Sequence, residues 1–175
     1  MIIQFCGLSG SGKTTLARNA KEYFTNKKVN IEVIDGDEYR KFLCSDLGFT
    51  KTDRNTNIRR LAFVAGKLSQ YNVISLICAI NPYEEIRNEV TRDYPGVKTI
   101  YIKCNIEELI RRDTKGLYRR ALLPEGDVQR VNNLSGVNDP FEVPLNPHLI
   151  IETDKESVFE SCQKLTSYIE SMLIY

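Results

Sequence analysis

The chain has 175 residues, of which 42% are hydrophobic and 27% charged, so it is long enough for one domain with a full hydrophobic core. Its formal net charge is +1, and no overall positive field would draw it to nucleic acid or to an anionic membrane surface. We therefore expect neither nucleic acid nor a membrane among its partners, and no apolar run approaches the length that spans a bilayer.

The five cysteines match neither a metal-binding motif nor a disulfide framework. We interpret them as reduced thiols, mostly buried, which is typical of a cytoplasmic protein. The apolar start at residues 1–6 is short for a signal peptide and lacks a basic leader, which also favours a cytoplasmic location.

Short apolar runs alternate with stretches of helical periodicity along the chain. Nearly continuous apolar runs of this length are typical of parallel strands that are buried on both faces. The alternation predicts a three-layer α/β fold with a five-stranded parallel sheet, in one domain covering residues 1–175. Strands are predicted at Ile2–Cys6, Ile31–Asp35, Val73–Ala79, Thr99–Cys104 and His148–Glu152.

Helical periodicity is clearest from Thr52 to Tyr71 and from Val158 to Met172, with Asp154 as the expected N-cap of the second helix. Residues 113–147 break the pattern, because they are rich in Arg, Pro, Gly and Asn and have little periodicity. A long irregular segment in a compact domain is usually a functional lid or a disordered loop, and we expect a lid.

The segment from Gly7 to Thr14 reads GLSGSGKT and satisfies the phosphate-binding pattern G-x-x-x-x-G-K-[ST]. It follows an apolar strand and precedes a helical pattern. These flanks favour a phosphate loop over the alternative, a chance glycine-rich turn. Lys13 should reach the β- and γ-phosphates of ATP, and Thr14 should ligate Mg²⁺. The expected ATP-binding residues of this loop are Gly7, Ser9, Gly10, Ser11, Gly12, Lys13, Thr14 and Thr15.

A phosphate loop also occurs in GTPases, but the pattern here favours a small-molecule kinase. The pair Asn26-Lys27 does not continue as the guanine-reading motif N-K-x-D. Residues 93–96 match D-x-x-G, yet they lie between a predicted helix and a predicted strand, so we interpret them as a turn. We interpret His148, the single histidine, as structural.

Asp35 and Asp37 follow the second predicted strand, and ligands of parallel sheets bind beyond the carboxyl ends of the strands. The two carboxylates suit a metal site at Asp35 and a proton acceptor at Asp37; the alternative is a tight turn with an Asp helix cap. Arg54 and Asn57 share one face of the next predicted helix. They suit an anionic acceptor, and the alternative is a solvated basic helix start.

The chain resembles the adenylyl-sulfate (APS) kinase family along nearly its whole length. That family phosphorylates the ribose 3′-hydroxyl of APS with ATP and Mg²⁺, and a homodimer is a reasonable expectation from it. The resemblance rests on segments Gly7–Ala17, Val33–Arg40, Asp46–Phe49, Arg54–Arg60, Asn81–Tyr83, Asp113–Ala121 and Gly136–Pro147.

The resemblance implies roles for individual residues. Asp37 is similar to the catalytic aspartate, Lys115 to the lid lysine, and Arg112 to the arginine that stacks on the adenine of ATP. Catalysis would therefore depend on Asp37, Lys13 and Lys115. The implied acceptor-binding residues are Arg40, Phe49, Arg54, Asn57, Ala79, Ile80, Asn81, Lys115 and Leu134.

Three positions depart from the family pattern on the acceptor side. Asn81 stands where the family usually has serine, Leu134 replaces the phenylalanine that forms the second wall of the base slot, and Ala79 replaces a bulky residue. Losing one stacking ring weakens a preference for a purine. The chain therefore resembles a branch of the family with a changed acceptor, and this resemblance implies cytidine diphosphoramidate, in capsule biosynthesis, as the acceptor. APS is the alternative acceptor, and an inert nucleotide-binding module is a third hypothesis.

Overall fold

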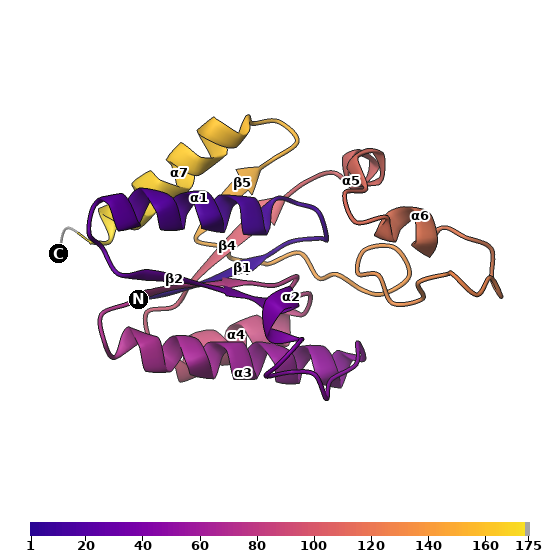
Figure 1. Ribbon diagram of the computed structural model, residues 1–175, viewed down its shortest axis with the longest axis horizontal. Coiled ribbons are helices and arrows are strands. Elements are labelled where there is room, and N and C mark those ends of the chain that lie inside the picture. The colour runs from indigo at the N-terminus through magenta and orange to yellow at the C-terminus, as the bar shows by residue number, and fades with distance from the viewer. Residues whose placement is uncertain (174–175) are drawn as a thin grey trace.

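A computed structural model of the chain describes residues 1–173. Its sheet is parallel throughout, with strand order β2-β3-β1-β4-β5 (Figure 1). The strands lie within one residue of the predicted bounds, and the prediction of a three-layer α/β fold with a five-stranded parallel sheet is confirmed. They are β1 (Ile2–Cys6), β2 (Ile31–Asp35), β3 (Ile74–Cys78), β4 (Lys98–Lys103) and β5 (Leu149–Glu152).

Helices cover both faces of the sheet (Figure 1). One face carries α1 (Lys13–Asn26) and α7 (Val158–Ser171), and the other carries α3 (Lys51–Ser69) and α4 (Glu84–Asp93). The central strand β1 serves both layers, because its alternate side chains point to opposite faces. Ile3 and Phe5 pack in the core beneath α1 and α7, whereas Ile2 packs in the core beneath α3 and α4.

The segment predicted as a lid is more ordered than its composition suggests. The short helix α5 (Ile106–Arg112) precedes it, α6 (Leu117–Ala121) lies within it, and both project beyond the carboxyl ends of the strands (Figure 1). These two helices and the returning chain form a small core of their own. Its buried members are Cys104, Leu109, Tyr118, Ala121 and Leu134.

The expected cap of the last helix is wrong. Ser157 caps α7 by accepting from the backbone N–H of Glu160, and the Glu160 carboxylate accepts from the backbone of Ser157 in return. Asp154 instead accepts a hydrogen bond from the backbone N–H of Asn105 at 3.2 Å. The sequence pattern S-x-x-E at residues 157–160 is the better marker of the helix start. In this pattern each side chain accepts from the backbone N–H of the other residue.

Other sequence interpretations agree with the structure. Residues 94–97 form the turn between α4 and β4, and Gly96 has φ of 89° there. The Nδ1 atom of His148 accepts from the backbone N–H of Thr99 at 3.1 Å, which is a structural contact between β4 and the start of β5.

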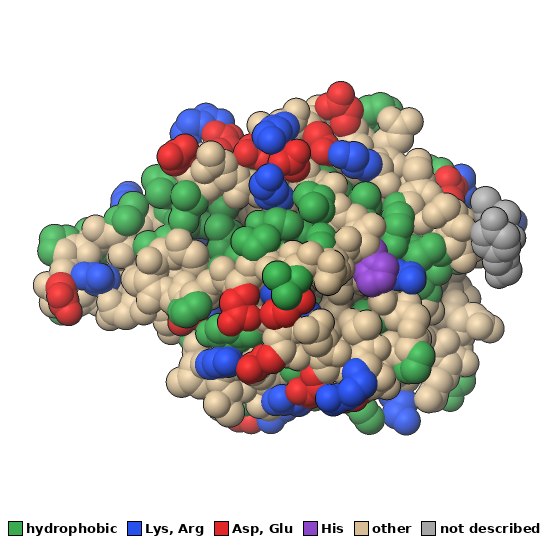
Figure 2. Space-filling view, turned by 180° about the vertical axis from the view of Figure 1, so that it is seen from behind, with side chains coloured by type: hydrophobic (Ala, Val, Ile, Leu, Met, Phe, Trp, Pro, Cys, Tyr) green, Lys and Arg blue, Asp and Glu red, His purple; other side chains and the backbone are tan. Residues whose placement is uncertain are grey.

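The cysteines are free thiols, and four of the five are buried. Among the helices of residues 1–173, none combines the length and the apolar character needed to cross a bilayer. Figure 2 shows acidic and basic side chains interspersed over one face of the molecule, as the net charge of +1 leads one to expect.

Candidate active site

The phosphate loop joins β1 to α1 at the carboxyl end of the central strand. Gly7 has φ of 152°, and a Cβ atom there would lie 2.3 Å from the backbone oxygen of Ile102 on β4. Gly12 is the N-cap of α1 with φ of 97°. The loop therefore packs against the neighbouring strand at a distance that only glycine allows. Because Gly12 leads directly into α1, the N-terminus of that helix faces the loop.

Lys13 is buried within this loop, with 9% of its surface exposed. Its Nζ donates to the carbonyl oxygens of Gly7 at 2.9 Å and Leu8 at 2.7 Å, and to Ser11 Oγ at 3.3 Å. The pKa of Lys13 is lowered to about 8, mainly by burial and in part by the neighbouring charge of Lys115. The ammonium group is thus held by neutral oxygen atoms of its own loop, and a bound anionic group would stabilise its positive charge.

Thr14 and Asp35 place two oxygen atoms side by side next to the loop. Thr14 Oγ1 donates to Asp35 Oδ2 at 2.9 Å, and Asp35 Oδ1 accepts from the backbone N–H of Asp37 at 2.9 Å. Asp35 is also the N-cap of the short helix α2 (Gly36–Tyr39), so the structure shows the helix cap that the sequence offered as the alternative interpretation. A hydroxyl and a carboxylate oxygen are ligands that suit Mg²⁺, which needs few protein ligands when phosphates supply the rest.

Lys115 reaches from the lid segment across the loop to the carboxylate of Asp37, with which it forms an ion pair. Both side chains line a hollow of about 200 Å³, which we name the loop hollow. Most of the residues predicted for ATP and metal binding meet here. Its lining is Ser9, Gly10, Gly12, Lys13, Thr14, Thr15, Asp35, Asp37, Cys78, Ala79, Ile80, Thr114 and Lys115.

A second, narrower hollow of about 60 Å³ lies beside the start of α3, and we name it the α3 hollow. It shares Asp37, Ala79 and Ile80 with the loop hollow, so the two spaces meet at the Asp37 carboxylate. Most residues predicted to bind the acceptor line it. The lining is Gly36, Asp37, Arg40, Phe49, Arg54, Asn57, Ile58, Ala79, Ile80, Asn81 and Pro82.

Two arginines flank the Phe49 ring in the α3 hollow. The guanidinium carbon of Arg40 lies 4.5 Å from the ring centroid and that of Arg54 lies 5.5 Å from it. Burial lowers the pKa of Arg40, and the charge of Arg54 adds to this effect. Two partly desolvated cations and one aromatic face suit a ligand that carries both anionic groups and a planar ring.

Two predicted acceptor residues do not present their side chains as expected. Leu134 lines neither hollow, because it is 4% exposed and packs in the small core of the lid segment. Asn81 lines the α3 hollow, but its amide donates to Gln4 Oε1 at 3.0 Å in the interior of the sheet. Asn81 also has φ of 49°, a conformation that asparagine tolerates better than most residues.

Arg112 lies at the rim of the phosphate loop, and its guanidinium donates to Glu108 Oε1 at 2.7 Å and to the carbonyl of Thr153 at 2.8 Å. Sequence reasoning missed two residues that brace the loop. Thr153 donates to the carbonyl of Ser11 at 3.0 Å, and Tyr118 donates to the carbonyl of Ser9 at 2.8 Å. Tyr118 lies in the family-like segment Asp113–Ala121 and Thr153 lies in no motif, but neither position indicates a contact with the loop. Both contacts join segments that are more than a hundred residues apart.

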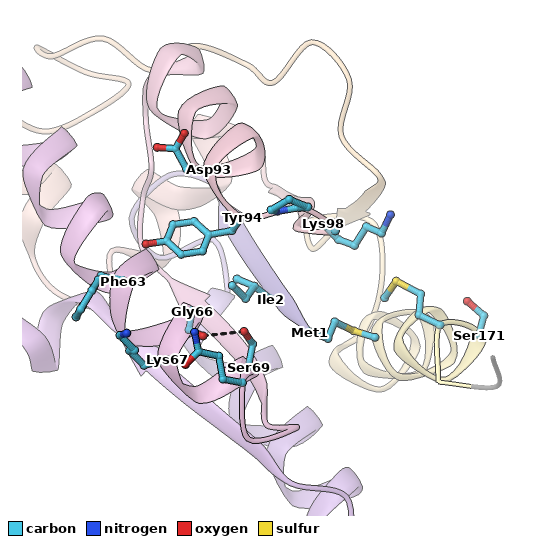
Figure 3. A pocket seen from close by; sticks show the side chains of 14 residues that line it. Met1, Ile2, Phe63, Gly66, Lys67, Ser69, Asp93, Tyr94, Lys98 and Ser171 are labelled. Carbon is cyan, nitrogen blue, oxygen red and sulfur yellow. Dashed lines mark hydrogen bonds between the residues drawn. The ribbon is translucent and has the colours of Figure 1, made fainter.

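A cavity of about 870 Å³ lies far from this site, near the N-terminal end of β1 (Figure 3). Figure 3 shows the Tyr94 ring and Phe63 beside it, together with the end of α3. None of the predicted site residues lines this cavity. Because ligands of parallel α/β sheets bind at the carboxyl ends of the strands, we place the functional site at the two smaller hollows.

Comparisons with known proteins give the family of the chain. The family model described as "Adenylylsulphate kinase" matches residues 1–152. A probable bifunctional SAT/APS kinase 2 of Sorangium cellulosum is 39% identical over 98% of this chain, although the chain spans only 29% of that protein. The adenylyl-sulfate kinase of Deinococcus deserti is 40% identical, over 96% of this chain and 90% of its own length.

Among solved structures, the chain is similar to the APS kinase CysC of Mycobacterium tuberculosis in complex with AMPPNP and APS. The TM-score is 0.88 at 33% sequence identity, and the match covers 97% of this chain and 96% of that one. The similarity therefore includes both the sheet and the segments around the two hollows.

Proposed function

We propose that this chain, which belongs to the adenylylsulphate kinase family, transfers the γ-phosphoryl group of ATP to the ribose 3′-hydroxyl of adenylyl sulfate. One observation carries the proposal. Asp37 lies where the loop hollow, with its phosphate-binding pattern, meets the α3 hollow, with its arginines and aromatic ring. A carboxylate at that junction would lie between a phosphoryl donor and a hydroxyl acceptor.

The hypothesis of a cytidine diphosphoramidate acceptor in capsule biosynthesis is wrong. Curated relatives at 39–41% identity are named as adenylyl-sulfate kinases or as a bifunctional protein containing one, over at least 96% of this chain. The alternative acceptor, adenylyl sulfate, therefore has the better support. The departure at Leu134 offers no counterargument, because its side chain packs in the small core of the lid segment. Asn81 lines the α3 hollow, but its side-chain amide already donates to Gln4.

On the donor side, the phosphate loop would hold ATP through its backbone N–H groups and the N-terminus of α1. The ammonium of Lys13 would turn from the carbonyls of Gly7 and Leu8 to the β- and γ-phosphates. The oxygens of Thr14 and Asp35 would hold Mg²⁺. When bound, Mg²⁺ neutralises charge on the β- and γ-phosphates.

On the acceptor side, Arg40 and Arg54 would bind the phosphate and sulfate groups, and the Phe49 ring would stack on the base. The 3′-hydroxyl would then lie at Asp37. Its oxygen forms a bond to the γ-phosphorus while the bond to the bridging oxygen of ADP breaks, and Asp37 accepts the hydroxyl proton. Lys115 would leave its ion pair with Asp37 and neutralise the transferring group.

The test follows ADP release with ATP, Mg²⁺ and adenylyl sulfate, and identifies the 3′-phosphorylated product by mass. Removing a positioned general base typically slows a reaction by about 10²–10⁴-fold, so we expect this loss in Asp37→Asn with ATP affinity nearly unchanged. Glu38→Gln is the matched control, because Glu38 is the next carboxylate on α2 but lines neither hollow.

Two outcomes would contradict the proposal. ATP binding without release of ADP in the presence of adenylyl sulfate would favour an inert nucleotide-binding module. Full activity of Asp37→Asn would remove Asp37 from the role of base.

A further inference from the structure

Among the described residues, Arg87 has the largest fully buried side chain, with 2% of its surface exposed. It lies on α4, behind the α3 hollow, and it lines neither hollow. Burying a charged group is costly unless the charge is paired and its donors are satisfied. The partners of this guanidinium therefore show which parts of the fold it holds in place.

Its partners come from three segments. Glu84 Oε2 on the same helix accepts from Nε at 2.9 Å and from Nη2 at 2.6 Å. The carbonyl of Asn81 accepts from Nη1 at 2.6 Å, and the carbonyl of Glu142 accepts from Nη2 at 2.7 Å. The planar guanidinium thus joins residues 79–82, which we name the acceptor wall, to residues 133–142, which we name the return arm.

Further hydrogen bonds fasten the return arm to the same place. The backbone N–H of Glu142 donates to the carbonyl of Pro82 at 2.8 Å. The Glu142 carboxylate accepts from the backbone N–H of Glu84 at 2.6 Å. The return arm is the end of the lid segment, so these contacts tie the lid to the wall of the α3 hollow.

The other end of the return arm contacts the α3 hollow directly. Arg54 Nη2 donates to the carbonyl of Asn133 at 2.5 Å, and Arg54 Nε lies 3.2 Å from Asp139 Oδ2 in an ion pair. Arg54 lines the α3 hollow, and the lid that ends in this arm also carries Lys115. A displacement of the arm at Glu142 would therefore shift groups on both sides of Asp37.

The backbone of the acceptor wall is held from the sheet side as well. Gln4 Nε2 donates to the carbonyl of Arg87 at 3.0 Å, so its Oε1 faces Asn81 and accepts from that amide at 3.0 Å. Asn81 keeps a positive φ of 49°, and its carbonyl accepts from the guanidinium. Both the amide and the carbonyl of Asn81 are thus fixed by one buried network.

We propose that Arg87 is a positioning residue for the acceptor. Its guanidinium holds the acceptor wall and the return arm in one geometry, so that Arg54 and the lid lysine are placed together around the acceptor. This inference rests on the proposed function, because the acceptor in question is adenylyl sulfate.

The kinetic test compares Arg87→Met and Arg87→Lys with Arg59→Met. Arg59 is a suitable control, because it is also an ion-paired arginine: it joins α3 to α4 through an exposed ion pair with Glu89 and lines neither hollow. Misplacing a substrate by about 1 Å can cost about 10²-fold. We expect the KM for adenylyl sulfate to rise about tenfold or more in Arg87→Met, while the KM for ATP changes less than about twofold. Arg87→Lys should restore part of the loss.

Hydrogen exchange gives a readout that does not depend on turnover. The amide of Glu142 is bonded to the carbonyl of Pro82, and it should lose protection in Arg87→Met but keep it in Arg59→Met. Wild-type protein that fails to phosphorylate adenylyl sulfate would refute the proposed function while leaving this exchange test intact. Equal rises in both KM values, or unchanged protection of Glu142 in Arg87→Met, would overturn the positioning role. Should Arg87→Met fail to fold, Arg87→Lys decides by the same two measurements.

Discussion

The buried lysine of the phosphate loop makes ATP binding depend on pH in a defined direction. Burial lowers the pKa of Lys13 from its usual 10.5 to about 8. This fall corresponds to about 3 kcal/mol against the charged form in the free protein. Bound phosphates favour the charged form, so the pKa of Lys13 should rise when ATP binds. Binding must then take up a proton at any pH between the free and the bound values.

The size of the uptake follows from the pKa of about 8. At pH 9 about 0.9 of the Lys13 population is neutral before binding, so about 0.9 proton should be taken up per ATP. At pH 7 the uptake should be about 0.1 proton. The direction of the pH dependence is fixed, because the complex binds more protons than the free protein, and a rise in pH therefore weakens ATP binding. ATP affinity should therefore fall about tenfold between pH 7 and pH 9.

Isothermal titration calorimetry at pH 9 in buffers of different ionisation enthalpy measures this uptake directly. Phosphate groups titrate near about pH 6, so ATP itself contributes little at pH 9. Lys13→Met is the control and should show almost no uptake. Equal proton uptake by wild type and Lys13→Met at pH 9 would refute the reasoning.

Two further predictions concern the scaffold. A Cβ atom on Gly7 would lie 2.3 Å from the backbone of Ile102, so Gly7→Ala should destabilise the fold by about 3 kcal/mol and abolish ATP binding, as thermal unfolding and calorimetry would measure. Gly126→Ala, at a positive φ but with nothing within 4 Å, should lose only about 1 kcal/mol, and equal losses would contradict the packing argument. Ser157→Ala removes the N-cap of α7 and should lower stability by about 1 kcal/mol with turnover unchanged, whereas a loss of turnover would contradict its purely structural role.

Local sequence was enough to predict the fold and the phosphate loop. The strand at Ile2–Cys6 has the predicted bounds, because a strand buried on both faces needs a continuous apolar run. The edge strand at Ile31–Asp35 is only partly buried, and it also has the predicted bounds. The loop is likewise encoded within eight consecutive residues. Asp35 and Asp37 could be placed at the site for the same reason, since they directly follow a predicted strand.

Long-range packing could not be read in the same way. Thr153 and Tyr118 brace the phosphate loop from positions more than a hundred residues away along the chain. No motif in the sequence marks Arg87, and only the folded chain brings the carbonyls of Asn81 and Glu142 to its guanidinium. Contacts to backbone carbonyls leave no trace in the identity of the residues that accept them.

The error over the acceptor has a physical cause. A substitution changes specificity when the altered atoms face the ligand, and sequence position alone does not give that direction. Leu134 points into the core of the lid segment, where a smaller apolar residue alters packing and leaves the α3 hollow as it was. The Asn81 amide is held by Gln4 inside the sheet. The residues that line the hollow include Phe49 and Arg54, where the sequence matches the family pattern, and Ala79, where it departs from that pattern.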